Sequence, residues 1–275
     1  MKVCMSSWSY HPVIASRQMD QLGWIKLCKE LELDGVELLD IHFPNLTKEY
    51  VLQVKKLVAD LGLEVPMCSV SNDFGKATEQ ERAASEKHVE TWINASAWFG
   101  AKFLRVFAGW PGQRDASKYE SEKAKLWPEM IQRLQRLCNL AGDKGILLAL
   151  ENHNHFGFTK TYEDLDRIIA EVGSDWLGVC LDTGDYLVDT ADVNGYAALE
   201  KAMIHTRIVH AKVYELDEEG KDLKQDWAKI FKILAGAVYD EWLSIEYEGK
   251  NCKDDVPRAA RWLLDQTMVT ARSRR

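Results

Sequence analysis

The chain has 275 residues, of which 46% are hydrophobic and 28% are charged, and its formal net charge is -8. This composition is that of an ordinary globular protein, which excludes collagen-like and largely disordered chains. Nucleic-acid binding usually depends on a face rich in Lys and Arg, so the acidic balance argues against a nucleic-acid partner. The sequence shows no signal peptide and no apolar run long enough to span a membrane, so we expect a cytoplasmic protein with no membrane partner.

Short apolar runs alternate along the chain with longer segments of helical periodicity. The short runs predict eight strands, over residues 2–8, 35–39, 64–70, 103–108, 146–151, 177–182, 207–213 and 243–247. The longer segments predict helices over residues 18–32, 47–61, 78–99, 117–143, 161–171, 195–205, 225–236 and 254–267. Thr47 and Thr161 precede acidic first turns as candidate N-caps, and Gly100 follows a predicted helix as a candidate end.

This alternation predicts a parallel sheet, because each helix must carry the chain back to the same edge of the sheet. Eight such units favour an α/β protein with a closed (β/α)8 TIM barrel, and an open doubly wound sheet is the alternative. We expect a single domain over residues 1–270, followed by a disordered basic tail over 271–275. The six cysteines lie mostly within apolar runs and are interpreted as reduced, buried thiols.

Four residues with metal-binding side chains stand at the ends of successive predicted strands. They are Glu151, Asp182, His210 and Glu246, and they are spaced by about one strand-helix unit. In a barrel the carboxyl ends of the strands form one rim, so these side chains would lie side by side. Three carboxylates and one imidazole suit one divalent metal ion, Mn2+ before Co2+ or Mg2+. The alternative is that each residue only caps a strand or pairs with a neighbouring Lys or Arg.

The sequences around these strand ends resemble a known family. Leu-Glu151-Asn-His153, Leu-Asp182-Thr-Gly-Asp185, Val-His210-Ala-Lys212 and Ser-Ile-Glu246-Tyr-Glu248-Gly are similar to strand ends of the xylose-isomerase-like TIM-barrel superfamily of sugar isomerases and epimerases. The resemblance implies that the four residues bind one metal ion. It also implies that Glu151 and Glu246 are the catalytic proton acceptor and donor on opposite faces of a carbonyl sugar.

Two positions depart from the pattern of this family. Asp185 stands where many relatives have a His, and the segment after Lys212 lacks an Arg that 3-epimerases usually carry. Both positions normally contact substrate oxygens in the family, so Asp185 is a candidate substrate-binding residue. The departures weaken the expectation of a ketose epimerase in particular.

Further candidates for substrate binding come from strand geometry and side-chain type. Residues two apart on a strand face the same side, so His153 and Lys212 are expected to point toward the site with Glu151 and His210. Trp110 and Glu248 are weaker candidates. Glu37 and Arg105 are charges inside apolar strands, and we interpret them as an interior ion pair that supports the barrel.

These observations predict a metal-dependent sugar isomerase or epimerase, acting by proton abstraction next to a carbonyl through an enediolate held by the metal. The closest alternative is a metal-dependent lyase that dehydrates a 3-keto sugar or an inosose. A phosphodiesterase like endonuclease IV and a non-catalytic sugar-binding barrel are further alternatives. The expected partner is a small sugar or keto-sugar, and a homo-oligomer is compatible with the sequence.

Overall fold

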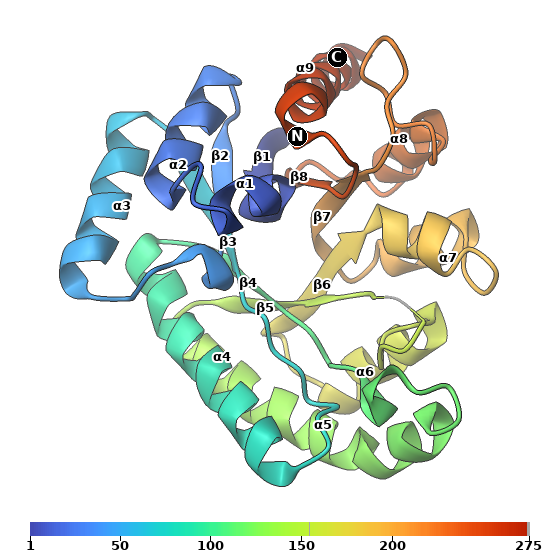
Figure 1. Cartoon of the computed structure of the whole chain (residues 1–275). Coiled ribbons are helices and arrows are strands. Elements are labelled where there is room, and N and C mark those ends of the chain that lie inside the picture. Colours follow the sequence, from blue (N-terminus) through green and yellow to red (C-terminus); the bar gives the residue numbers. More distant parts are fainter. Residues whose placement is uncertain (154, 274–275) are drawn as a thin grey trace. The chain divides into compact units, whose positions relative to one another are not determined.

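The structure is a computed structural model that describes residues 1–153 and 155–273, without the side chains of residues 113, 114 and 270–273. Its eight parallel strands follow one another in chain order around a closed barrel, with helices between them (Figure 1). The predicted (β/α)8 fold is confirmed, and the open sheet is excluded. The strands are β1 Lys2–Ser6, β2 Gly35–Leu39, β3 Glu64–Ser69, β4 Phe103–Val106, β5 Leu147–Glu151, β6 Leu177–Asp182, β7 Thr206–Val213 and β8 Trp242–Tyr247.

Every predicted helix is found in the structure, and among the α-helices of the described residues the short α1 was not predicted. The helices are α1 His11–Ala15, α2 Gln21–Glu30, α3 Lys48–Asp60, α4 Glu79–Phe99, α5 Tyr119–Gly142, α6 Tyr162–Val172, α7 Tyr196–Ala202, α8 Trp227–Gly236 and α9 Cys252–Ser273. The tail predicted over residues 271–275 lies partly outside the described residues, and α9 continues to Ser273.

The fold contains two compact units. The first unit combines Met1–Pro66 with Ile208–Arg275. Its strands pair in the order β7, β8, β1 and β2, with Lys212 opposite Glu246 and Ser6 opposite Glu37. In this unit α2 and α3 lie side by side (Figure 1). The Thr47 hydroxyl accepts a hydrogen bond from the amide of Tyr50, which confirms the predicted cap of α3.

The second unit is Met67–Arg207, and its strands pair in the order β3, β4, β5 and β6. Its long helices α4 and α5 run alongside each other (Figure 1). Helix α4 begins with a capping box between Thr78 and Glu81 and ends at Gly100, whose φ of 78° is a conformation that favours glycine. Thr161 caps α6 as the sequence predicts.

The loop after β1 differs from the sequence prediction. We expected the strand to run to residue 8, but it ends at Ser6, and Ser7–Tyr10 form a 3-10 turn that leads into α1. Pro12 sits in the first turn of α1, where its missing N–H costs no hydrogen bond. This early turn places Trp8 and His11 at the carboxyl end of β1.

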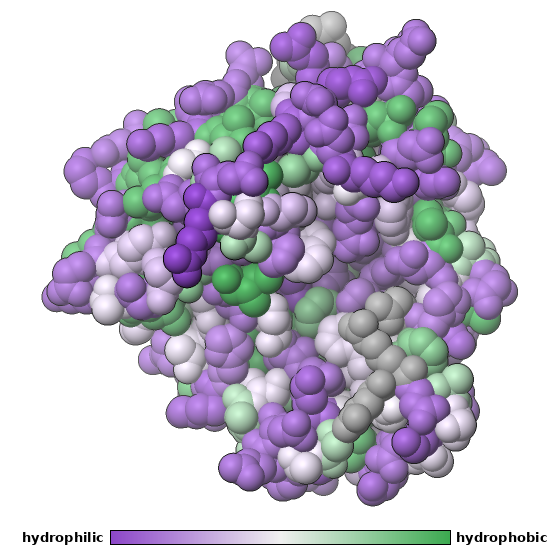
Figure 2. Space-filling view, viewed as in Figure 1, coloured by the Kyte–Doolittle hydropathy of each residue, from purple (hydrophilic) through white to green (hydrophobic). Residues whose placement is uncertain are grey.

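Polar side chains prevail on one face of the molecule. Figure 2 shows a face on which hydrophilic residues prevail and hydrophobic ones are scattered.

The six cysteines are free and buried, in agreement with the prediction of structural thiols. Within the described part of the chain, none of the helices combines the length and hydrophobicity that crossing a membrane requires.

Candidate functional site

In the first unit, four predicted site residues lie together on the second halves of β7 and β8 and directly after β8. The Lys212 ammonium contacts Glu246 Oε2 at 2.7 Å and Glu248 Oε1 at 3.2 Å. His210 Nδ1 lies 3.5 Å from Glu246 Oε2, and the imidazole is completely buried. The structure therefore brings His210, Lys212, Glu246 and Glu248 into one cluster.

Glu37 fixes the orientation of the His210 ring. Its Oε2 atom accepts a hydrogen bond from Ser244 Oγ at 2.5 Å and lies 3.0 Å from His210 Nε2. A carboxylate only accepts hydrogen bonds, so Nε2 is the protonated nitrogen that donates to Glu37. The Nδ1 lone pair is then directed toward the Glu246 carboxylate, and two electron-rich groups that face each other require a cation or a proton between them.

The ionisation of Glu246 follows from its surroundings. Burial alone would raise the pKa of this carboxyl, but the neighbouring Lys212 ammonium holds its pKa well below the usual range. Glu246 is therefore a carboxylate at neutral pH, which is the form that a metal ligand or a proton acceptor needs.

In the second unit, Glu151 and Asp182 are the last residues of the adjacent strands β5 and β6. Arg105 Nε lies 3.4 Å from Glu151 Oε2, and both side chains are buried. Asn152 joins the two strand ends, because its side chain accepts from the Asp182 amide at 2.8 Å and donates to the Asp182 carbonyl at 2.9 Å. This pair of hydrogen bonds holds the Asp182 backbone in place.

Three more predicted residues lie together in the second unit. His153 Nδ1 is 2.8 Å from Asp185 Oδ2, so the carboxylate favours the tautomer that is protonated at Nδ1. The His153 ring stacks on Phe107 and meets Trp110 edge-on, with centroids 4.9 and 5.0 Å apart. Asp185 begins a single π-helical turn, Asp185–Asp189, and its own amide donates to Asp182 Oδ1 at 3.0 Å.

Sequence analysis missed Asn152 and two histidines near strand ends in the first unit. His11 Nδ1 is 2.9 Å from His42 Nε2, and His42 Nδ1 is 2.7 Å from Ser7 Oγ. His11 follows β1 and His42 follows β2, so the strand-end pattern that singled out His210 could also have found them. The strand predicted over residues 2–8 is two residues too long, which hid the turn that carries His11.

The neutral state of His42 has a consequence for stability. Burial and then the neighbouring His11 lower the pKa of His42 to about 4, while Asp40 opposes the shift. Below about pH 6.5 the unfolded chain takes up a proton at this residue and the folded chain does not, so acid favours unfolding. Between pH 6 and 4 we expect His42 to remove up to about 1.4 kcal/mol of unfolding free energy per pH unit.

The measurement is urea unfolding at several pH values in the presence of a chelator, for the wild type and His42→Gln. The variant should lose stability less steeply below pH 6. His205→Gln is the control, because His205 lies partly exposed beside Asp166. Equal slopes for the wild type and His42→Gln would contradict this origin of the acid sensitivity.

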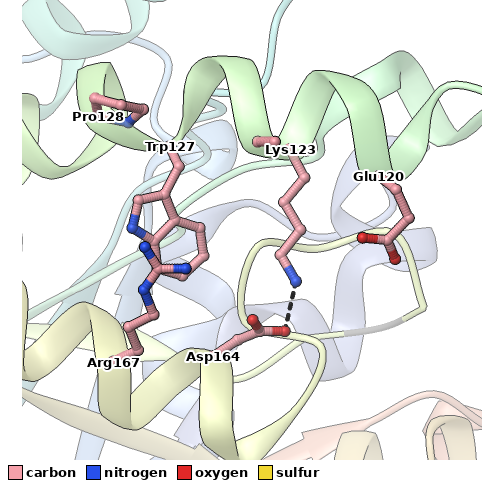
Figure 3. A pocket seen from close by; sticks show the side chains of 7 residues that line it. Glu120, Lys123, Trp127, Pro128, Asp164 and Arg167 are labelled. Carbon is pink, nitrogen blue, oxygen red and sulfur yellow. Dashed lines mark hydrogen bonds and ion pairs between the residues drawn. The ribbon is translucent and has the colours of Figure 1, made fainter.

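A cavity of about 410 Å³ lies in the second unit, between α5 and α6, and it is a rival candidate for the site (Figure 3). Its Lys123 is paired with Asp164 at 2.6 Å. Arg167 stacks on Trp127 at 4.3 Å and is paired with Glu171 at 2.6 Å. These charges neutralise one another on the outer helices, whereas the acids and histidines described above gather at strand ends.

Comparisons with known proteins bear on the fold and the family of the chain. The family model for the xylose isomerase-like TIM barrel matches residues 25–266. An inosose dehydratase of Bacillus velezensis is 27% identical over 143 residues, which cover 44% of this chain and 47% of the relative. The match thus spans about half the length of that curated relative.

Two solved structures show the same fold over nearly the whole chain. One is a D-tagatose 3-epimerase-like protein, with a TM-score of 0.79, 20% identity and complete coverage of both chains. The other is the IolI protein with a bound zinc atom, with a TM-score of 0.74, 15% identity and 98% of each chain covered. The similar proteins include an L-ribulose 3-epimerase among the solved structures as well as the inosose dehydratases.

Proposed function

Because the chain belongs to the xylose isomerase-like TIM barrel family, we propose that it is a metal-dependent enzyme that moves protons next to the carbonyl of a small sugar or keto-sugar. The leading reaction is isomerisation or epimerisation. The observation that carries the proposal is the pair formed by His210 and Glu246. A tautomer fixed by Glu37 directs the Nδ1 lone pair of His210 toward a buried carboxylate, as a cation site requires.

The proposed ligands of the ion are Glu151, Asp182, His210 and Glu246. These residues form one of the groups in the described part of the chain that could hold a metal ion. Their strands β5 to β8 are consecutive in the barrel. Oxygen-rich donors with one imidazole fit Mn2+ best, with Co2+ or Mg2+ as alternatives. When bound, the ion would polarise the substrate carbonyl and stabilise the negative charge that develops when a neighbouring proton leaves.

The chain's own residues would perform the proton transfer. Glu246, held ionised by Lys212, would take the proton from the substrate carbon, and Glu151 in its protonated form would deliver a proton to the opposite face. Lys212 would also offer positive charge to a developing oxyanion. Trp110, His153, Asp185 and Glu248 are the proposed contacts to the remaining substrate oxygens.

A dehydratase is the second candidate, and the His153–Asp185 pair favours it. Loss of a hydroxyl group as water needs a proton donor, and a histidine oriented by a carboxylate is suited to that role. The similarity to inosose dehydratases points in the same direction. Both reactions begin with the same proton abstraction, so they differ only in the later steps.

Product analysis with D-fructose, D-tagatose and 2-keto-myo-inositol distinguishes the two reactions. Asp185 only accepts hydrogen bonds, whereas a His can donate one to a substrate oxygen. We therefore expect Asp185→His to raise activity on the ketoses relative to the inosose by about tenfold. Asp189→His is the control, because Asp189 ends the same π-helical turn. Unchanged relative activities in Asp185→His would place this residue outside the substrate pocket.

A further inference from the structure

The carboxyl ends of β1 and β2 carry a chain of hydrogen bonds that the proposed reaction does not use. Ser7 Oγ accepts from the Leu39 amide at 3.3 Å and contacts His42 Nδ1 at 2.7 Å, and His42 Nε2 contacts His11 Nδ1 at 2.9 Å. Ser7 is completely buried and His42 is almost so. All of these residues belong to the first unit.

The Ser7 hydroxyl determines the direction in which the hydrogen bonds between Ser7, His42 and His11 are donated. A buried hydroxyl proton without an acceptor is costly, and His42 Nδ1 is the one acceptor for it among the contacts of the described residues. Ser7 therefore donates to Nδ1 of His42, and His42 carries its proton on Nε2. That proton is donated to Nδ1 of His11, so neutral His11 carries its own proton on Nε2.

The far nitrogen of His11 is left as a donor. In the parts of the chain that the structure describes, no group accepts a hydrogen bond from His11 Nε2. The ring is partly exposed and stacks on Trp8, with centroids 4.5 Å apart. A fixed donor on an aromatic wall suits a polyhydroxylated ligand, which offers both C–H faces and acceptor oxygens.

Contacts within the first unit connect this wall to the proposed proton acceptor. Trp8 Nε1 donates to Glu248 Oε1 at 3.2 Å, the same oxygen that Lys212 contacts, and Lys212 contacts Glu246. The wall formed by Trp8 and His11 thus continues the row of side chains at the strand ends, from β8 to β1 and β2. A ligand in reach of Glu246 would extend along it toward His11.

We propose that His11 is a specificity-determining residue, which donates a hydrogen bond from Nε2 to an oxygen of the bound sugar or keto-sugar, and that Ser7 and His42 fix the tautomer that makes it a donor. This inference rests on the proposed function for the class of ligand. The hydrogen-bond direction itself rests on the geometry alone.

The direction is tested by long-range 15N–1H correlation spectra of protein labelled at histidine nitrogens and supplied with diamagnetic Mg2+. His11→Phe and His42→Phe assign the signals. We expect both His11 and His42 to carry the proton on Nε2 in the wild type. Ser7→Ala should release the constraint and give a mixture of tautomers. Protonation of His42 at Nδ1 in the wild type would overturn the proposal.

The ligand contact is tested by calorimetric titration of the Mg2+-supplied protein with D-fructose and with 2-keto-myo-inositol. His11→Phe keeps a ring against Trp8 but removes the donor, and we expect the Kd of the bound probe to rise by about three- to tenfold. His205→Phe is the control and should leave Kd unchanged, because His205 directly precedes the amino end of β7.

An unchanged Kd in a folded His11→Phe variant, or no binding of either probe to the wild type, would overturn the role of His11. If the probes bind, the Kd rises as expected and no turnover occurs, the inference stands and the proposed reaction falls. If turnover occurs but His11→Phe binds like the wild type, the reaction stands and the inference falls.

Discussion

Replacing Glu246 by Gln should lower turnover by roughly 100- to 10,000-fold, the range that a positioned acid or base contributes. The amide has nearly the same shape, but it cannot accept the proton from the substrate carbon. Glu151→Gln should have a loss of similar size, because it removes the proposed partner on the opposite face. Both variants should remain folded, since each keeps the size of a buried side chain.

Single-turnover and steady-state rates of these variants are measured at saturating Mn2+, so that weaker metal binding does not mimic a loss of proton transfer. Glu248→Gln is the matched control. Glu248 contacts the same lysine but is 37% exposed and carries no proton in the proposed reaction. We expect it to lose less than about tenfold, as for one rim hydrogen bond. A near-normal rate in Glu246→Gln would exclude Glu246 as the base.

Removal of the metal ion should abolish activity and destabilise the fold. Without the ion, the clustered carboxylates repel one another. A divalent ion present at a free concentration of about 100 times its Kd adds about 2.7 kcal/mol to the free energy of unfolding. For a chain of this size that corresponds to a rise in Tm of roughly 5 to 10 °C. Elemental analysis should find one divalent ion per chain, and Mn2+ should restore both activity and Tm after treatment with a chelator.

Asp182→Asn tests which residues hold the ion. The substitution removes a charge while the backbone contacts of Asp182 with Asn152 can remain. We expect the Mn2+-induced rise in Tm to shrink to near zero in this variant. Asp175→Asn, at a position outside the strand ends, should respond to Mn2+ like the wild type. An equal rise in Tm for Asp182→Asn and the wild type would mean that the ion binds elsewhere.

The sequence allowed the barrel to be predicted because its signals are local. Apolar runs, Thr caps and helix-ending glycines recur along the strand-helix units, and the strand bounds of β2 and β6 were predicted without error. The strand-end acids could be found for the same reason, since a charged residue that closes an apolar run contrasts with its neighbours in the sequence. Their use as metal ligands remains a proposal.

The features that could not be predicted depend on contacts between distant segments. Nothing near Glu37 in the sequence indicates that it orients His210, 173 residues away. Likewise the hydrogen bond between Ser7 and His42 depends on the ends of β1 and β2 lying side by side. The π-helical turn at Asp185 was also not predicted, because such turns have no strong sequence pattern.

Solvent-deuterium exchange tests the proposed chemistry most directly. The Mn2+-loaded protein is incubated in D2O with D-fructose, D-tagatose or 2-keto-myo-inositol, and deuterium in recovered substrate and product is located by NMR. The expected result is incorporation next to the carbonyl of at least one compound, which is lost in Glu246→Gln and after chelation. Conversion of a substrate without any deuterium at that carbon, or exchange that persists in Glu246→Gln, would contradict metal-assisted proton abstraction by this site.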